Sequence, residues 1–283
     1  MFRAMRGILT FVTGGMVLLA LSVAAGPVRA QSVVSSGESF VDMRLFPGRA
    51  ESDGSRLVAL VIDVAPGWKT YWRNPGAAGI PPSFDWSASR NLRAAEVMWP
   101  RPVRFDSFGL STLGYGGQVV FPVRLDPEDR AAPLDISVGV ALGVCRDICV
   151  LEEATVGTVI APDAPEIGGA LLRAAEALVP RPGAAQGLRT VSCRLTGAGA
   201  KRAFEATLDF DNPPLSPEVI LEGPEQTWFT ASETTTDDAG AITVRADLSL
   251  LDGSSWLDRS DIRMTVLAND FAADIVGCSA SGS

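Results

Sequence analysis

Short runs of β-branched and apolar residues alternate along the chain with turns rich in Gly, Pro, Asp and Ser from Phe40 onward. This spacing is typical of antiparallel sandwiches rather than of βαβ units. The run Leu57–Val64 is almost continuously apolar, which predicts a fully buried strand. Further strands are predicted at Gln118–Leu125, Leu134–Val144 and Ala154–Ile160. Turns are expected at Pro66-Gly67, Asn74-Pro75-Gly76 and Pro81-Pro82.

A single helix interrupts this pattern. Apolar residues fall near helical spacing from Glu166 to Leu178, and the segment Pro180–Gly183 then breaks the helix and forms a linker. Strands follow again at Leu188–Arg194, Ala203–Phe210, Ala241–Leu248 and Ile262–Asn269. We therefore expect an all-β protein made of one antiparallel sandwich and a second β-sandwich domain, with a short linking helix between them.

The amino terminus is a predicted targeting segment. Arg3 and Arg6 precede the uncharged apolar run Ile8–Ala25, and Val28-Arg29-Ala30 supplies a small-residue cleavage site. This pattern predicts a signal peptide over residues 1–30. An uncleaved membrane anchor is the alternative, because the apolar run is long enough for one. No later stretch reaches that length, so we expect no stable membrane insertion after cleavage.

Composition and charge exclude several classes of function. The net charge is −9, and loss of Arg3, Arg6 and Arg29 with the signal peptide lowers it to −12. No basic footprint exists for nucleic acid. The chain has no His, which excludes Ser-His-Asp and Cys-His catalysis, a His-ligated zinc and a c-type haem. Export would place the cysteines in an oxidising compartment, where disulfides persist.

The four cysteines divide into two unlike pairs. Cys145 and Cys149 have three residues between them, whereas Cys193 and Cys278 lie near the two ends of the second module. Four cysteines allow three pairings, and proximity favours Cys145 with Cys149. In the chain-entropy model the long ring contributes about 4.6 kcal/mol and the short ring about 2 kcal/mol before strain is subtracted. We therefore expect Cys193–Cys278 to be the structural disulfide.

Three interpretations of Cys145–Cys149 compete. The first is a structural staple, and the second is a copper or zinc site, which without His would depend on scattered carboxylates and Met. The third is a redox dithiol, because strained and exposed disulfides have labile, more oxidising potentials. The nearby charges do not decide between these interpretations, since Arg146 favours a thiolate and Asp147 opposes it. We favour the redox dithiol, and we expect no metal and no cofactor.

Aromatic residues concentrate in one part of the chain. Both tyrosines and four of the six tryptophans lie between residues 68 and 121. Sandwich packing explains several of them. The segment Asp106–Leu110, however, predicts a flexible loop tip, where Phe108 could cover a reactive disulfide. Packing at the sandwich edge is the alternative for this side chain.

Five motifs follow one another along the first module. They are GWKTYWRNPG at 67–76, WPRP at 99–102, GYGG at 114–117, VFPV at 120–123, and CRDIC at 145–149 followed by Glu152-Glu153. Taken in this order, they resemble the periplasmic amino-terminal domain of the thiol:disulfide interchange protein DsbD and its ScsB-like relatives. The resemblance covers roughly residues 36–161.

The resemblance implies an immunoglobulin-like sandwich that carries a redox cysteine pair on a hairpin under an aromatic cap loop. By position, Cys145 and Cys149 match the redox pair, with Cys149 as the partner-facing nucleophile. The segment Phe105–Tyr115 matches the cap region, and Tyr71 falls where the family carries aromatics near the pair. The expected domains are then the signal peptide at 1–30, the redox domain at 36–161, the helix and linker at 162–185 and the second β-sandwich at 186–283.

The resemblance also implies partners. Full-length relatives continue into membrane spans and a thioredoxin-like domain, so we expect a separate membrane electron-transfer protein as donor and periplasmic thioredoxin-like proteins as acceptors. The cysteine gap in the fused members is longer than three residues. The predicted function is a periplasmic protein-disulfide reductase or redox relay, in cytochrome c biogenesis or stress-related electron transfer. The alternative is a non-catalytic periplasmic binding or assembly module with purely structural disulfides.

Overall fold

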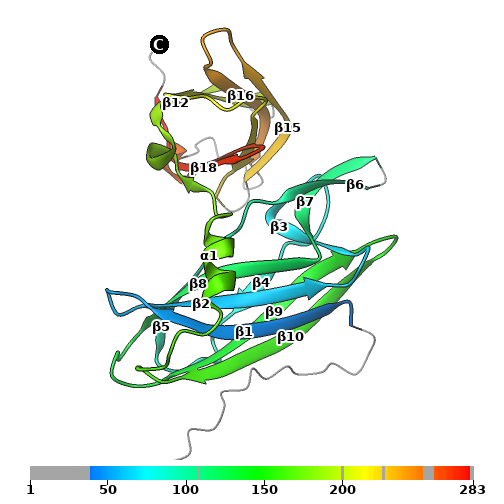
Figure 1. Cartoon of the computed structure of the whole chain (residues 1–283). Helices are drawn as coiled ribbons and strands as arrows, with labels where there is room; N and C mark the ends of the chain where they lie inside the picture. The colour runs from blue at the N-terminus through cyan, green and yellow to red at the C-terminus, as the bar shows by residue number, and fades with distance from the viewer. Residues whose placement is uncertain (1–38, 108, 199–200, 225–226, 251–257, 281–283) are drawn as a thin grey trace, which may run out of the picture.

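The structure is a computed structural model that describes residues 39–280 apart from 108, 199–200, 225–226 and 251–257. Its elements are almost all β-strands, arranged in two sandwiches joined by one helix (Figure 1). The expected all-β fold, with immunoglobulin-like antiparallel sandwiches, is confirmed. The predicted signal peptide over residues 1–30 and the candidate cap residue Phe108 lie outside the described residues.

The first sandwich packs a four-stranded sheet against a six-stranded sheet, and all its strand pairs are antiparallel. The four-stranded sheet has the order β1 (Val41–Ala50), β2 (Arg56–Val64), β8 (Gln118–Pro127) and β5 (Leu92–Val97). The other sheet has the order β10 (Cys149–Ile160), β9 (Leu134–Cys145), β3 (Lys69–Gly76), β7 (Leu110–Gly116) and β6 (Val103–Ser107), and β4 (Ser83–Asp85) also pairs with β9.

The nearly continuous apolar run of β2 is explained by burial on both faces. Val58 and Leu60 point into the main core between the two sheets. Leu57 and Ala59 point outward and pack against Leu172 of the helix α1 (Gly169–Glu176), which covers this sheet (Figure 1). A strand with one face in water would instead alternate apolar and polar residues. The predicted fully buried strand is therefore confirmed.

The helix is shorter than the predicted segment Glu166–Leu178. Gly168 precedes α1 with φ +83°, a left-handed conformation that keeps the residues before it out of the helix. At the other end the Leu178 amide bonds the Ala175 carbonyl at 2.9 Å, so the last turn tightens before Pro180. The predicted helix is therefore in the right place, but the prediction extends it too far at both ends.

One predicted turn is part of a strand. Asn74-Pro75-Gly76 forms the last three residues of β3, where the register with β7 shifts between Tyr71 and Gly76. A proline is tolerated in this irregular stretch because its missing N–H is not needed for the ladder. Pro66-Gly67, in contrast, forms the expected turn, with Gly67 at φ +81°.

The second sandwich begins directly after the helix and linker. One sheet has the order β11 (Arg181–Pro182), β18 (Phe271–Val276), β17 (Arg263–Ala268) and β14 (Glu218–Glu222). The other has the order β15 (Thr227–Thr236), β16 (Ile242–Leu250), β13 (Lys201–Phe210), β12 (Leu188–Ala198) and β19 (Ser279–Ala280). Short 3-10 turns occupy Gly183–Gln186 and Arg259–Asp261. Strict alternation in β13 places Phe204, Ala206, Leu208 and Phe210 in a separate second core.

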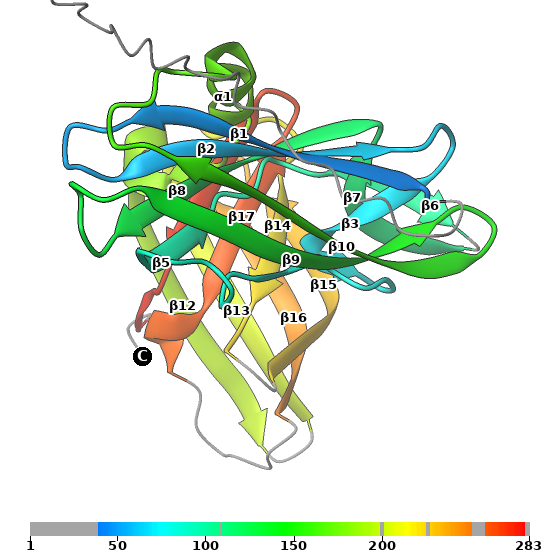
Figure 2. The same cartoon turned by 90° about the horizontal axis from the view of Figure 1, so that it is seen from below.

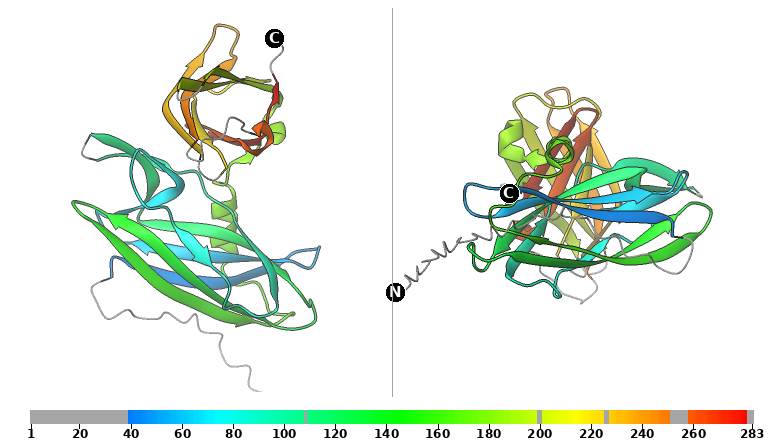
Figure 3. Two further views of the ribbon diagram at one scale, coloured as in Figure 1. Left: turned by 180° about the vertical axis from the view of Figure 1, so that it is seen from behind. Right: turned by 60° about the horizontal axis from the view of Figure 1, so that its bottom comes forward.

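The second sandwich stands on the side of the first that carries β3, β6 and β7 (Figures 1 and 3). Its strands cross the direction of the strands in the first sandwich (Figure 2). The two parts are also linked away from the helix, because Asn74 on β3 donates to the Leu221 carbonyl on β14 at 3.0 Å.

Candidate redox site

The Cys145–Cys149 disulfide closes the tip of the β9–β10 hairpin. Cys145 is the last residue of β9, Cys149 is the first residue of β10, and the two are cross-strand partners with Cα atoms 4.1 Å apart. The three residues between them make the turn, in which the Arg146 amide donates to the Ile148 carbonyl at 3.0 Å. Strand pairing therefore holds both cysteines in position whether or not they are bonded.

The two cysteines differ sharply in accessibility. Cys145 is only 3% exposed, whereas Cys149 is exposed at the surface. Two exposed apolar side chains flank Cys149, since Ile148 is 66% exposed and Leu151 is 53% exposed. Of the two cysteines, Cys149 is thus the one that a thiolate from another protein can reach, and apolar side chains are exposed beside it.

Tyr71 of β3 supplies a hydroxyl to the disulfide. Its Oη donates to Sγ of Cys145 at 2.9 Å and lies 3.8 Å from Sγ of Cys149. Burial raises the pKa of Tyr71 above its ordinary value of 10.0, so the hydroxyl keeps its proton at neutral pH. Gly79, at φ +123°, lies against the ring, where a Cβ would approach it to 2.3 Å. A glycine at position 79 is therefore required for this placement of the tyrosine.

Lys69 lies buried on the same strand, and the sequence reasoning missed it. It is the register partner of Cys145 across β3 and β9 and is only 7% exposed. Its Nζ donates to Thr112 Oγ1 at 3.2 Å and lies 5.1 Å from the ring centroid of Phe105. Burial lowers the pKa of Lys69, and the nearby Asp106 carboxylate acts in the opposite direction. The available signal was the strand period, which puts Lys69 on the same face as Tyr71.

The predicted cap segment Phe105–Tyr115 is a β-hairpin made of β6 and β7. Phe105 is half-buried over the Lys69 ammonium, and Leu110 near the hairpin tip is 46% exposed. Tyr115 does not lie with the cysteine pair. It packs in the core at 5.5 Å from the ring of Phe121. Its hydroxyl donates to the Pro100 carbonyl at 2.7 Å, which makes it a packing residue of the sandwich.

The second disulfide joins Cys193 and Cys278, which are 85 positions apart in the sequence. Cys193 lies on β12 and is 1% exposed, and Cys278 packs against the second core. The bridge ties the first long strand of the second sandwich to its last segment. A disulfide of this span stabilises the fold by limiting the unfolded chain. Cys193 is buried and Cys278 is half-buried, so neither cysteine is as exposed as Cys149.

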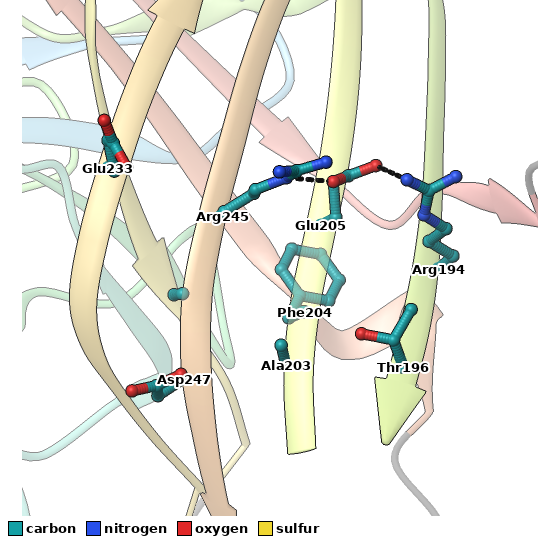
Figure 4. A pocket seen from close by; sticks show the side chains of 9 residues that line it. Arg194, Thr196, Ala203, Phe204, Glu205, Glu233, Arg245 and Asp247 are labelled. Atoms are coloured by element: carbon teal, nitrogen blue, oxygen red, sulfur yellow. Dashed lines mark hydrogen bonds and ion pairs between the residues drawn. The ribbon is translucent and has the colours of Figure 1, made fainter. Parts of the chain in front are cut away.

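A depression on the outer face of the second sandwich has a volume of about 340 Å³ (Figure 4). Its floor is crossed by ion pairs from Arg194 and Arg245 to the shared carboxylate of Glu205. Glu233 and Asp247 also belong to the lining, so it carries both signs of charge, and it contains no thiol. We assign no chemistry to this depression.

Within the described residues, no group of three or more acidic or Cys side chains is placed to hold a metal ion. None of the described helices is both long and apolar enough to cross a bilayer.

Comparisons with known proteins agree with this geometry. Residues 41–160 match the family model described as "Thiol:disulfide interchange protein DsbD, N-terminal". The crystal structure of the N-terminal periplasmic domain of ScsB from Proteus mirabilis superposes with a TM-score of 0.67 at 22% identity, over 89% of this chain and 98% of that one. That likeness establishes a shared fold across both sandwiches. No curated protein matches the sequence. Residues 41–160 of this chain therefore form a DsbD/ScsB-like N-terminal domain.

Proposed function

We propose that this protein is a periplasmic thiol-disulfide relay, which takes electrons from a separate membrane protein and passes them to periplasmic thioredoxin-like proteins. One observation carries the proposal. An exposed cysteine, Cys149, is bonded to a buried cysteine, Cys145, whose sulfur accepts the Tyr71 hydroxyl. A purely structural staple needs neither an accessible sulfur nor a hydrogen-bond donor aimed at the other sulfur.

In the reducing half of the cycle, a thiolate of the donor attacks Sγ of Cys149. A donor–Cys149 disulfide forms, the Cys145–Cys149 bond breaks, and Cys145 leaves as a thiolate. The Tyr71 hydroxyl is 2.9 Å from that sulfur and stabilises the developing negative charge. The donor's second thiolate then attacks its own sulfur in the mixed disulfide and releases Cys149, so the donor is oxidised by two electrons.

The oxidising half runs the same chemistry toward the acceptor. The Cys149 thiolate attacks a disulfide of the partner, which leaves a Cys149–partner disulfide and one partner thiolate. The Cys145 thiolate next attacks Sγ of Cys149, which reforms the intramolecular disulfide and releases the partner as a dithiol. Strand pairing keeps the two sulfurs within reach, because Cys145 and Cys149 remain register partners.

The site of action follows from the same proposal. We place the mature protein in the periplasm after removal of residues 1–30, and the apolar Ile148 and Leu151 beside Cys149 as the surface that the partners contact. The cap role of the Phe105–Tyr115 hairpin, with Phe108 as its aromatic, stays a prediction, because Phe108 lies outside the described residues.

Trapping of mixed disulfides tests the relay. A Cys145→Ser variant retains the exposed Cys149 and lacks the resolving thiol, so it should accumulate Cys149-linked complexes with periplasmic proteins in cells. The matched Cys149→Ser variant retains only the buried Cys145 and should trap few. Thiol labelling of the parent should find the pair partly reduced after isolation. A pair that is always oxidised, together with no trapped complex, would identify a module with structural disulfides only.

A further inference from the structure

Strand β14 of the second sandwich contacts a hydrophobic core on each of its two faces. Val219 and Leu221 point into the core of their own domain. The alternate residues are Glu218, Ile220 and Glu222, and Ile220 packs against the core of the first sandwich. By the two-residue period of a strand, this second face is directed at the redox domain.

The first contact from this face reaches the strand that carries Tyr71. Arg73, two positions beyond Tyr71 on β3, places its Nε 3.0 Å from both carboxylate oxygens of Glu222. Its Nη2 also donates to Thr265 at 2.8 Å and lies 3.5 Å from the carboxylate of Asp274. The Arg73 and Glu222 side chains are only 14% and 19% exposed, so solvent screens this pair less than an ordinary surface pair.

The second contact reaches the hairpin that lies over Lys69. Arg104 of β6 forms an ion pair with Glu218, four positions before Glu222 on β14. The next residue on β6 is Phe105, whose ring lies 5.1 Å from the Lys69 ammonium. Two lines of contact therefore run from one strand of the second sandwich toward the surroundings of Cys145. One reaches β3 two positions beyond Tyr71, and the other reaches β6 beside Phe105, whose ring lies against Lys69.

We infer that the second sandwich positions the redox site, with Arg73 and Arg104 as positioning residues that act through Tyr71 and Lys69. This inference rests on the proposed relay function. Tyr71 stabilises the Cys145 thiolate only while its hydroxyl stays within hydrogen-bond distance of the sulfur. The ammonium of Lys69 favours a nearby thiolate only while the β6–β7 hairpin keeps it buried in place. By bonding β3 and β6 at once, β14 fixes both groups relative to the cysteine pair.

The test uses the full mature chain with the charge-neutralising pair Glu218→Gln and Glu222→Gln. Two properties of Cys145 and Cys149 are measured, namely the thiol pKa in the reduced form and the equilibrium constant with glutathione. Loosening the two contacts weakens stabilisation of the thiolate. The thiol pKa should rise, and the equilibrium should shift toward the disulfide by roughly three- to tenfold.

A matched control breaks an ion pair of the first sandwich that touches neither β3 nor β6. Asp63→Asn removes the partner of Arg44 on β1 and β2 and should leave both properties unchanged. Exchanging the charges, with Arg104→Glu and Glu218→Arg together, should restore the parent equilibrium, whereas either substitution alone should not. This exchange separates positioning from a general loss of stability.

The single variant Glu218→Gln guards against a failure of the double variant to fold, because Arg104 and Glu218 are each 42% exposed and tolerate substitution. If these variants lower the melting temperature and leave both thiol properties at the level of Asp63→Asn, the second sandwich does not position the site, and the relay proposal stands. If the pair of the parent protein resists reduction altogether, the relay proposal fails and the inference fails with it.

Discussion

The hydroxyl of Tyr71 donates to the sulfur of Cys145, the buried cysteine, and lies farther from the sulfur of Cys149, at 2.9 Å against 3.8 Å. This difference assigns unequal roles to the two thiols. The buried sulfur is the one whose negative charge the protein stabilises. The exposed sulfur is the one that a partner can reach. In the proposed relay, the leaving group and the nucleophile are thus separated by their surroundings.

Substitution of Tyr71 by Phe removes the donor and keeps the ring. The pKa of the Cys145 thiol should rise by about one unit or more, because a hydrogen bond to a charged group contributes about 1.5–3 kcal/mol. The pH dependence of alkylation of the reduced protein, read by mass spectrometry for each cysteine, measures this. Tyr115→Phe is the matched control, since its hydroxyl bonds the Pro100 carbonyl. An equal shift in both variants would contradict the assignment.

Alkaline titration should detect both tyrosines of the chain as abnormal. Burial raises the pKa of Tyr71 above 10.0 and raises that of Tyr115 further. In the unfolded chain both phenols lose their protons near pH 10, before the folded phenols do, so the free energy of unfolding should fall as the pH rises above about 10. Tyrosinate absorbance in the folded protein should appear only above that value. Ionisation of either tyrosine at its ordinary pKa would contradict its burial.

Removal of the Cys193–Cys278 bridge should destabilise the second sandwich. The double variant Cys193→Ala and Cys278→Ala is expected to lose about 2–5 kcal/mol, because the bridge closes a ring that spans 85 positions. The control removes Cys145 and Cys149 in the same way, and loss of its ring of four positions should cost less. Denaturant unfolding of both variants measures the difference. Equal losses would mean that ring length does not explain the stabilisation.

The proposed cap is tested at Phe108. Phe108→Ala should speed oxidation of the reduced pair by a small non-partner disulfide, because removal of the ring would uncover the thiols. Leu110→Ala on the same hairpin removes an exposed side chain of similar size and serves as the control. The oxidation is quenched at a series of times, and mass spectrometry of the remaining thiols gives the rates. Identical rates in the parent and in Phe108→Ala would remove this side chain from the mechanism.

The mature protein is expected to begin near Gln31. The charged start, the apolar run and the Val28-Arg29-Ala30 motif together define the predicted signal peptide. Intact-mass measurement of protein recovered from the periplasm checks this directly. A mass that includes residues 1–30 would point to the uncleaved anchor instead.

Local patterns predict much of this fold. The eight strands read from apolar runs lie within or largely overlap observed strands, because β-branched runs between turn residues leave few alternatives. The pattern fails where geometry depends on distant neighbours. Asn74-Pro75-Gly76 has the composition of a turn and yet forms the end of β3. There the Asn74 side chain donates a hydrogen bond to the Leu221 carbonyl of the second sandwich.

The site shows the same limit. Proximity in the sequence predicts the Cys145–Cys149 pair, and the family resemblance implies that a hairpin carries it. The structure has the pair at the tip of the β9–β10 hairpin. The two tyrosines cannot be distinguished by position in an aromatic-rich segment, although one contacts the pair and the other packs in the core. The burial of Lys69 and the contact of Arg73 with Glu222 depend on which sheets face each other, and this is information that no local window contains.

Strand β14 is the last strand of its sheet, and among the strands that the structure describes it pairs with β17 alone, so one side of its backbone has no strand partner there. Such edges are templates for pairing with another chain and for aggregation. Here the edge is occupied from both sandwiches, because Thr234 of β15 accepts the Val219 amide at 3.1 Å and Asn74 of the first sandwich donates to the Leu221 carbonyl at 3.0 Å. A fragment cut at the linker would lose the Asn74 contact. The first sandwich therefore also shields part of its neighbour's edge, and the second half of the chain made alone should self-associate more readily than the whole chain.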